Sequence, residues 1–170
     1  EQLKCAYNGN LFFDKTKGQV YGMEVMELIL DMFVEVMKKG PLAREPSVNV
    51  KISMTDMTLH EDAIHRGPAQ VYPAIREGIR GAMVTAGPII LEPMQVMLIE
   101  GPVEYMGELT KLVTSMRGQL IDVDQEGTQV AIKAKMPVMN MLGWSSDLRS
   151  ATEGRGISSL VDQSFEKIPM

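Results

Sequence analysis

The stretch LHEDAIHRGPAQ, at residues 59–70, gathers several chemically active side chains into a short segment. It contains both histidines of the chain, together with two acids and an arginine. These residues are His60, Glu61, Asp62, His65 and Arg66. Imidazole, carboxylate and guanidinium groups this close in sequence suit three kinds of chemistry: metal binding, acid–base catalysis, and contact with phosphates or bases.

The spacing of the two histidines bears on the first of these, a metal site. The segment HEDAIH resembles the zinc motif H-E-x-x-H but has one residue too many. On a helix, residues five apart point about 140° away from each other, so the two imidazoles could not share one ion. In a loop they can still converge, although no further His or Cys lies nearby to complete a tetrahedral set. We predict no metal site, and a small metal-dependent hydrolase using His60, Glu61 and His65 is the alternative hypothesis.

Acid–base or nucleophilic catalysis needs more than this segment supplies. Asp62 could orient and polarise the imidazole of His65, as a general base requires. However, no Ser or Cys nucleophile lies near it in sequence, and the chain contains no G-x-S-x-G motif. It also contains no G-x-x-x-x-G-K-[ST] phosphate loop. The sequence therefore predicts no catalytic residue in this chain.

A contact loop is the third interpretation, and the segment's position favours it. The sequence HRG follows a strand-like run and precedes a helix-like run, which is where rigid scaffolds present functional groups. Arginine and histidine suit phosphates and single-stranded bases, so we expect Arg66 to contact a phosphate. The net charge is −5, so any contact with nucleic acid must be local.

The elements around this loop follow from hydrophobic periodicity. Residues 23–38 are predicted to form a helix, whose acidic stripe is interpreted as solvated surface. Residues 47–56 alternate between apolar and polar side chains and predict a half-buried strand. Residues 68–87 predict a second helix, in which Pro73 must either lie in the first turn or introduce a kink.

The second half of the chain begins after a segment that contains two prolines and has its own order of predicted elements. Residues 87–93 contain two prolines and are interpreted as a linker. After it we predict a strand, a helix, two strands joined by a turn, a helix broken near Gly143, and a last strand. Their ranges are 94–101, 102–118, 119–127, 128–137, 137–152 and 156–168. The order β-α-β-β-α-β is that of the ferredoxin-like sandwich.

Length and composition limit the number of domains, the cellular compartment and the contact with membranes that can be expected. The chain has 170 residues and is 45% hydrophobic, which suits one medium domain or two small ones. A single cysteine, Cys5, excludes an internal disulfide and fits a reducing, cytoplasmic compartment. No apolar run approaches the roughly 20 residues needed to cross a bilayer, so we expect no membrane contact.

The residue string itself resembles a known family. The segments NGNLFFDKTKGQVYGMEVMELILDMFVEVMKKGPLAREP and LHEDAIHRGPAQVYPAIREGI are similar to the fourth domain of the translation elongation factor 2 family, in its archaeal form. The segments EPMQVMLIEGPVEYMGELTKLVTSMRGQLIDVDQEG and LRSATEGRG are similar to its fifth domain. The resemblance implies an α+β chain: an S5-like α/β domain, partial at its start, over residues 1–90, and a ferredoxin-like domain over residues 91–170.

The resemblance also implies a function. Family members are GTP-dependent ribosomal translocases, whose GTP- and magnesium-binding domains would lie outside this chain, so no cofactor and no enzymatic turnover are expected within it. His65 occupies the position that the family converts to diphthamide. The loop residues His60, Asp62, Ile64, Arg66 and Gly67 would shape or make its contact with the decoding region. The implied partners are the ribosome, with its rRNA, tRNA and mRNA, and the diphthamide-synthesis enzymes, and the chain is expected to be a monomer.

Overall fold

The computed structural model describes residues 1–17 and 21–169, and residues 18–20 and 170 lie outside the description. The chain divides into two compact units, Glu1–Pro88 and Ile89–Met170. Each unit has a hydrophobic core of its own. Among the described residues, no helix has both the length and the apolar character needed to cross a membrane.

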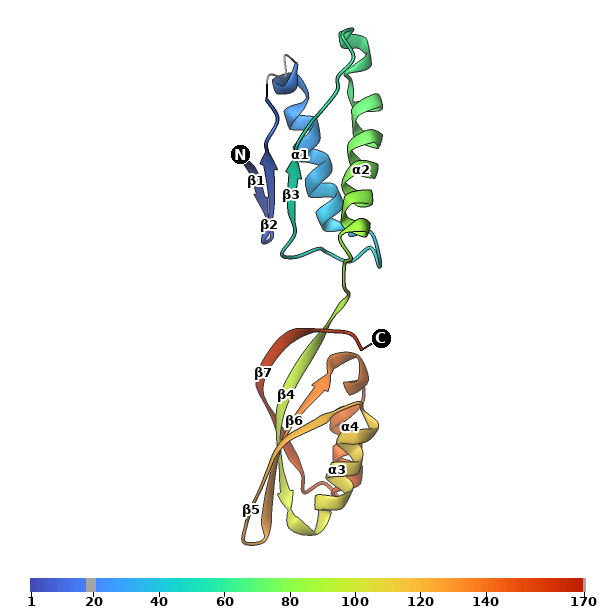
Figure 1. Ribbon diagram of the computed structural model, residues 1–170. Helices are drawn as coiled ribbons and strands as arrows, with labels where there is room; N and C mark the ends of the chain where they lie inside the picture. Colours follow the sequence, from blue (N-terminus) through green and yellow to red (C-terminus); the bar gives the residue numbers. More distant parts are fainter. Residues whose placement is uncertain (18–20, 170) are drawn as a thin grey trace. The chain divides into compact units, whose positions relative to one another are not determined.

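The first unit is a small sheet covered by two helices on one face (Figure 1). The sheet has the order β1-β2-β3, in which β1 and β2 are antiparallel while β2 and β3 are parallel. The elements are β1 (Gln2–Tyr7), β2 (Asn10–Asp14), α1 (Gly22–Lys38), β3 (Lys51–Met54) and α2 (Pro68–Thr85). Both helices were predicted from periodicity, and both are confirmed to within three residues at each end.

The hairpin of β1 and β2 was not predicted. It turns at Asn8 and Gly9, whose φ angles are +47° and +75°. Two consecutive left-handed residues match the twist of the flanking strands, and Asn-Gly is the sequence most favoured for this turn. The dipeptide was therefore an available signal for the hairpin.

The core of this unit lies between the sheet and the helices. Phe12 of β2 meets Phe33 of α1 with ring centroids 5.5 Å apart. The apolar residues at four-residue spacing in α2 face this core, since Val71, Ile79 and Met83 are buried and Ile75 is half-buried. Pro73 lies inside α2, beyond the first turn, so the helix tolerates it without ending there.

The strand predicted over residues 47–56 is shorter in the structure, where β3 begins at Lys51. A buried side chain explains the difference. Asn10 donates from Nδ2 to the carbonyl of Ser47 at 2.7 Å, and its Oδ1 accepts from the backbone N–H of Val50 at 2.9 Å. These bonds engage backbone groups of Ser47 and Val50 with a side chain, and Asn49 between them has φ +59°, which is not the backbone of a strand.

The second unit is a four-stranded antiparallel sheet with two helices on one face (Figure 1). Its elements are β4 (Leu91–Pro102), α3 (Met106–Ser115), β5 (Gln119–Glu126), β6 (Gln129–Pro137), α4 (Trp144–Ala151) and β7 (Ile157–Lys167). The spatial order β5-β6-β4-β7 and the chain order β-α-β-β-α-β confirm the ferredoxin-like sandwich. The core joins the inner face of β4 and β6 to α3 and α4.

Two boundaries in this unit differ from the sequence prediction. The linker predicted over residues 87–93 is shorter, because β4 already begins at Leu91 and Pro93 pairs with Phe165 of β7. The helix predicted over residues 102–118 begins with a separate 3₁₀ turn at Val103–Tyr105. The predicted break near Gly143 is confirmed, since this glycine has φ +86° and precedes α4.

Candidate functional site

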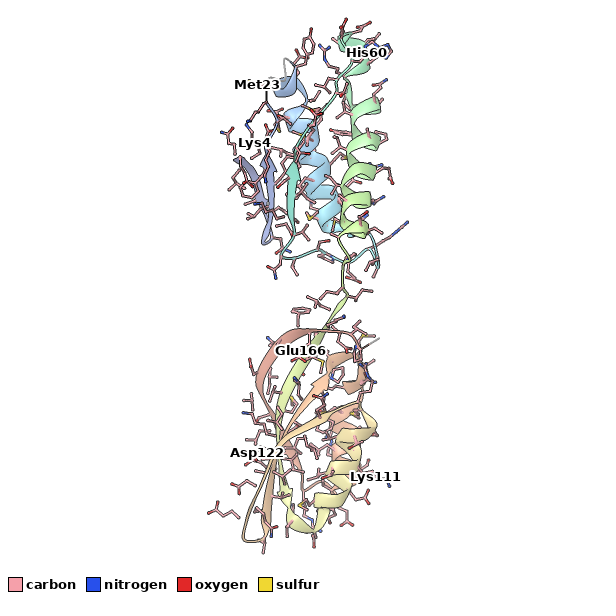
Figure 2. The ribbon with its side chains drawn as sticks, viewed as in Figure 1. Lys4, Met23, His60, Lys111, Asp122 and Glu166 are labelled. Atoms are coloured by element: carbon pink, nitrogen blue, oxygen red, sulfur yellow. The ribbon has the colours of Figure 1, made fainter. Side chains whose placement is uncertain are left out.

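The stretch at residues 59–70 spans most of the connection between β3 and α2 and the start of α2, at the end of the first unit where α2 begins (Figure 2, near His60). Its centre is a 3₁₀ turn at Ala63–His65. Asp62 caps this turn, because its Oδ1 accepts the backbone N–H of Ile64 at 3.1 Å. The short polar side chain of Asp62 thus gives the loop its local shape.

The turn presents two different side chains to solvent. Ile64 is 73% exposed, although it is a large apolar residue. The side chain of His65 is also exposed. An exposed apolar group beside an imidazole can contact both the flat face and the polar edge of a ligand.

The two histidines converge, as the loop interpretation allowed. Their ring centroids are 4.5 Å apart in an edge-to-face arrangement. His60 also accepts the backbone N–H of Asp62 on its Nδ1 at 3.0 Å. This bond ties the imidazole of His60 to the backbone of its own loop.

The converging histidines do not build a metal centre in the part of the chain that the structure describes. No group of three or more His, Cys, Asp or Glu side chains there is arranged to hold a metal ion. The Nδ1 atom of His60 is already used by the loop's own backbone. The metal-dependent hydrolase therefore gains no support from the geometry of His60, Glu61 and His65.

Arg66 is the anchor of the loop. Within residues 59–67, all of which are described, it is the one residue classed as buried. Its Nη1 donates to the carbonyls of His60 at 2.8 Å and Glu61 at 2.6 Å. On the other side, Nε and Nη2 reach Oε2 of Glu24 at 3.1 and 2.9 Å. The guanidinium also lies 4.0 Å from the ring centroid of Tyr21.

This geometry changes the expectation for Arg66, which the sequence suggested would contact a phosphate. Its side chain is 7% exposed, and three of its nitrogens already have partners. In this conformation the guanidinium faces the protein interior and binds the loop's own carbonyls. The structure thus favours a role for Arg66 in shaping the loop that carries His65.

Gly67 connects the loop to the helix. It is the N-cap residue of α2, with φ −78° and ψ 170°, and its carbonyl accepts the backbone N–H groups of Gln70 and Val71. Pro68 follows at the first helical position, where a missing N–H costs nothing. A methyl group on Gly67 would make only an ordinary contact at 3.5 Å, so neither φ nor space demands glycine here.

Sequence reasoning missed the partners that α1 supplies. The acidic stripe of α1 was interpreted as solvated surface, and three of its four acids are exposed as expected, but three of the four also have partners on α2 or the loop. Glu24 pairs with Arg66, Glu35 with Arg76 at 3.3 Å, and Asp31 accepts from the hydroxyl of Tyr72 at 3.3 Å. The acids remain partly exposed. Acids spaced along one helix, with basic residues spaced along the next, were the available signal.

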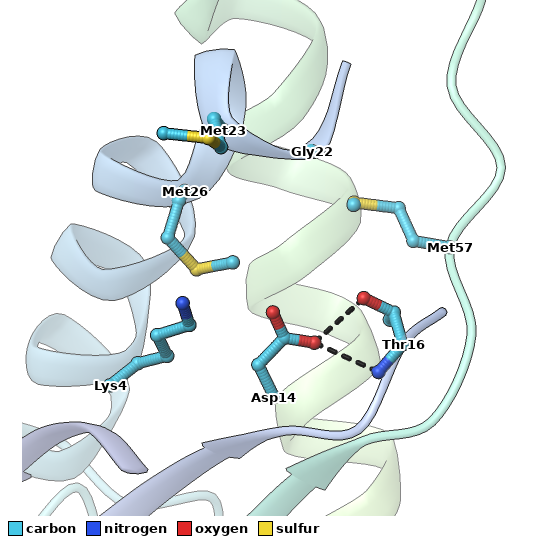
Figure 3. A pocket seen from close by; sticks show the side chains of 7 residues that line it. All are labelled: Lys4, Asp14, Thr16, Gly22, Met23, Met26 and Met57. Carbon is cyan, nitrogen blue, oxygen red and sulfur yellow. Dashed lines mark hydrogen bonds between the residues drawn. The ribbon is translucent and has the colours of Figure 1, made fainter. Parts of the chain in front are cut away.

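A pocket near the start of α1 lies beside β1 and β2 and is drawn in Figure 3. Three methionines line it together with Lys4, Asp14, Thr16 and Gly22. Asp14 accepts from the backbone N–H of Thr16 at 2.9 Å and from its hydroxyl at 2.7 Å. The hydrogen bond from the Thr16 hydroxyl is the largest cause that lowers the pKa of Asp14 below its ordinary value.

The class of protein follows from comparison with known families. The family model for "Elongation factor G, domain IV" matches residues 3–87, and the model for "Elongation factor G C-terminus" matches residues 89–170. The two matches cover nearly the whole chain and divide it where the two units divide. The chain belongs to the elongation factor G family of translation factors.

The relatives that the chain resembles include archaeal proteins named Elongation factor 2. The chain is 47% identical over 169 residues to Elongation factor 2 of Nanoarchaeum equitans, covering 99% of this chain and 23% of the relative. It is 48% identical over 163 residues to Elongation factor 2 of Pyrococcus furiosus, covering 96% and 22%. The family resemblance read from the sequence is confirmed, and the chain spans less than a quarter of the length of these relatives.

Proposed function

We propose that this chain is the ribosome-contacting part of a GTP-dependent translocase that moves tRNA and mRNA during translation elongation. The loop at residues 59–67 enters the decoding region, and His65 is its contact residue. The GTP and magnesium sites lie in the parts of the relatives that this chain does not span, so the chain itself performs no catalysis. Its family membership and the shape of its loop support this proposal.

The observation that carries the proposal is that the exposed tip of the loop is held in place by the rest of the unit. Ile64 and His65 project from a 3₁₀ turn, while Arg66 ties the backbone on the other side of that turn to the body of the unit. A supported tip can approach an RNA duplex without losing its shape, which lowers the entropic cost of binding. The acidic surface of the chain, with a net charge of −5, keeps other parts from binding RNA indiscriminately.

We further propose that His65 is modified to diphthamide. The exposed imidazole is accessible to a modifying enzyme, and the neighbouring His60, Asp62 and Gly67 shape the loop that such an enzyme would recognise. Diphthamide adds a bulky cationic arm to the imidazole. A fixed cation can bridge phosphates that a histidine, mostly neutral at pH 7, holds weakly.

Mass spectrometry tests the modification directly. The peptide of residues 52–66, from protein purified from its native source, is expected to carry added mass on His65. An unmodified His65 in native protein would contradict this part of the proposal. The ribosomal role needs a separate test, because a bare imidazole can still contact RNA.

The ribosomal role is tested by the translocation rate of the full-length factor that carries this chain. His65→Ala is expected to slow translocation without changing GTP hydrolysis, since the GTP site lies elsewhere. Lys111→Ala, which changes an exposed residue of α3 in the second unit, is the matched control and should leave the rate unchanged. Equal rates for His65→Ala and the unmodified sequence would overturn the proposed role of the loop.

A further inference from the structure

The loop that carries His65 lacks an apolar core of its own. From His60 to His65 every residue is exposed, and Leu59 and Gly67 at its two ends are only partly buried. Leu59 packs against the core of the first unit, but residues 60–65 do not, so burial of apolar surface contributes little to the order of the turn itself. The polar and cation–π contacts given for the loop and the start of α1 involve the guanidinium of Arg66.

The guanidinium needs a partner to stay where it is. An arginine side chain remains charged at all physiological pH values, and its burial is costly unless the charge is compensated. The two carbonyls of His60 and Glu61 supply hydrogen-bond acceptors but no net charge. Glu24 supplies the charge, with Oε2 at 2.9 and 3.1 Å from two guanidinium nitrogens, and Tyr21 supplies an aromatic face at 4.0 Å.

We propose that Glu24 of α1, assisted by Tyr21, is a positioning residue for His65. Glu24 holds the Arg66 guanidinium inward, Arg66 in turn fixes the carbonyls of His60 and Glu61, and these carbonyls lie at the base of the turn that presents His65. Without Glu24, the guanidinium turns to solvent and the turn loses its connection to α1. The link to translocation rests on the proposed function, whereas the link to loop order does not.

The acidic stripe of α1 offers a matched control. Glu27 lies one turn after Glu24 on the same helix and is exposed, and no hydrogen bond or ion pair of its side chain is present among the described residues. Glu24→Gln and Glu27→Gln remove the same charge from the same helix. A difference between them therefore reports the contact with Arg66 and not the net charge.

The experiment measures amide hydrogen exchange by NMR at residues 62–66 of the 170-residue chain. Glu24→Gln is expected to speed exchange of the His65 and Arg66 amides, which donate to the carbonyls of Asp62 and Ala63, by roughly threefold to tenfold. It should also weaken the ring contact between His60 and His65, seen as a lost nuclear Overhauser effect. Glu27→Gln should change neither. Equal exchange in both variants would overturn the proposal.

A charge-reversed pair distinguishes positioning from a simple ion pair. In the double variant Glu24→Arg/Arg66→Glu the opposite charges remain, but a carboxylate cannot donate to the carbonyls of His60 and Glu61. Loop exchange should therefore stay fast, with a circular dichroism spectrum like that of the unmodified chain. Restored protection in a folded double variant would contradict the proposed mechanism.

The proposed function is tested separately in the same series. If Glu24→Gln loosens the loop while His65→Ala leaves translocation unchanged, the positioning role stands and the ribosomal role fails. If His65→Ala slows translocation while Glu24→Gln leaves loop exchange unchanged, the ribosomal role stands and the positioning role fails.

Discussion

Each unit of this chain has a short loop that contains an arginine, and the two arginines are used in opposite ways. In the first unit Arg66 is buried and donates to backbone carbonyls of its own loop. In the second unit the side chain of Arg155 is 51% exposed, pairs with Glu104 at 2.8 Å, and lies over the ring of Tyr105. One guanidinium supports a backbone, whereas the other belongs to the surface.

The difference comes from what else holds each loop. The loop at residues 152–156 is fixed by Thr152, which is fully buried. Its hydroxyl donates to the carbonyl of Leu148 at 2.7 Å and accepts the backbone N–H of Gly156 at 2.8 Å. The loop at residues 59–67 has no such buried hydroxyl, and its backbone is held instead by the charged side chain of Arg66. The presence of an arginine in a loop therefore does not indicate its role.

The largest effect is expected from Gly156→Ala. A β-carbon at this position would lie 2.8 Å from both Oγ1 and Cγ2 of Thr152, whose side chain is locked by its hydrogen bond to Leu148. We expect a loss of about 2–3 kcal/mol in the free energy of unfolding of the second unit. Urea unfolding followed by fluorescence of Trp144, which lies in this unit, measures it.

Gly107→Ala is the control for that substitution. Gly107 lies in α3, and an added methyl group meets no atom within 4 Å. This variant should be neutral or more stable, because alanine favours a helix over glycine. If both alanine variants unfold at the same urea concentration, close packing around Gly156 does not contribute to the stability of the second unit.

Thr152→Val is expected to have the next largest effect. Valine keeps the shape of the side chain but removes the hydroxyl, so the backbone N–H of Gly156 loses its acceptor in a buried place. The expected loss is about 1–2 kcal/mol in the free energy of unfolding, measured in the same way. Thr152→Ser keeps the hydroxyl and should lose less. A serine variant as unstable as the valine variant would assign the effect to packing.

The arginine comparison itself is tested by Arg66→Lys and Arg155→Lys. Lysine keeps the charge, but its three donors sit on one nitrogen, so it cannot reproduce the contacts that Arg66 makes from three nitrogens of a planar fork. Arg66→Lys should speed amide exchange across residues 62–66 by about fivefold. Arg155→Lys should leave exchange in residues 152–156 unchanged, because Thr152 holds that loop. Faster exchange in the second loop would show that Arg155 supports its backbone too.

The smallest effect is expected at the hydrogen bonds between Asp14 and Thr16. Thr16→Val removes the hydroxyl bond and should raise the pKa of Asp14 toward its ordinary value, as measured by NMR titration of the carboxyl carbon. A lowered pKa in the folded state adds stability above the ordinary aspartate pKa. That stability is lost as the pH falls through the folded pKa.

The pH profile gives the control for this prediction. The difference in stability between the unmodified chain and Thr16→Val should be present at neutral pH and should disappear in acid. Thr16→Ser, which can make both bonds, should follow the unmodified chain. A stability difference that is the same at neutral and acidic pH would assign the effect to packing around Thr16.

Much of the fold was predictable, because its signals are local. The apolar stripes of α1 and α2 and the β-α-β-β-α-β order of the second unit follow from periods of 3.6 and 2 in the sequence. One miss, the β1–β2 hairpin, had a local signal in Asn8 and Gly9, whereas two boundary errors arose where pairing with distant parts of the chain set the ends of a strand. Residues 47–50 leave the strand because of Asn10, about 40 positions away, and Pro93 lies in β4 because that strand continues into the apparent linker.

The candidate site also has some features that the sequence predicted and one that only the tertiary structure determined. The sequence alone determined that residues 59–70 include a polar connection before a helix, and that the chain resembles elongation factor 2. Only the tertiary structure decided where Arg66 points. An arginine in a loop can face a ligand or its own backbone, and the choice depends on whether an acid such as Glu24, 42 residues earlier, comes within hydrogen-bonding distance.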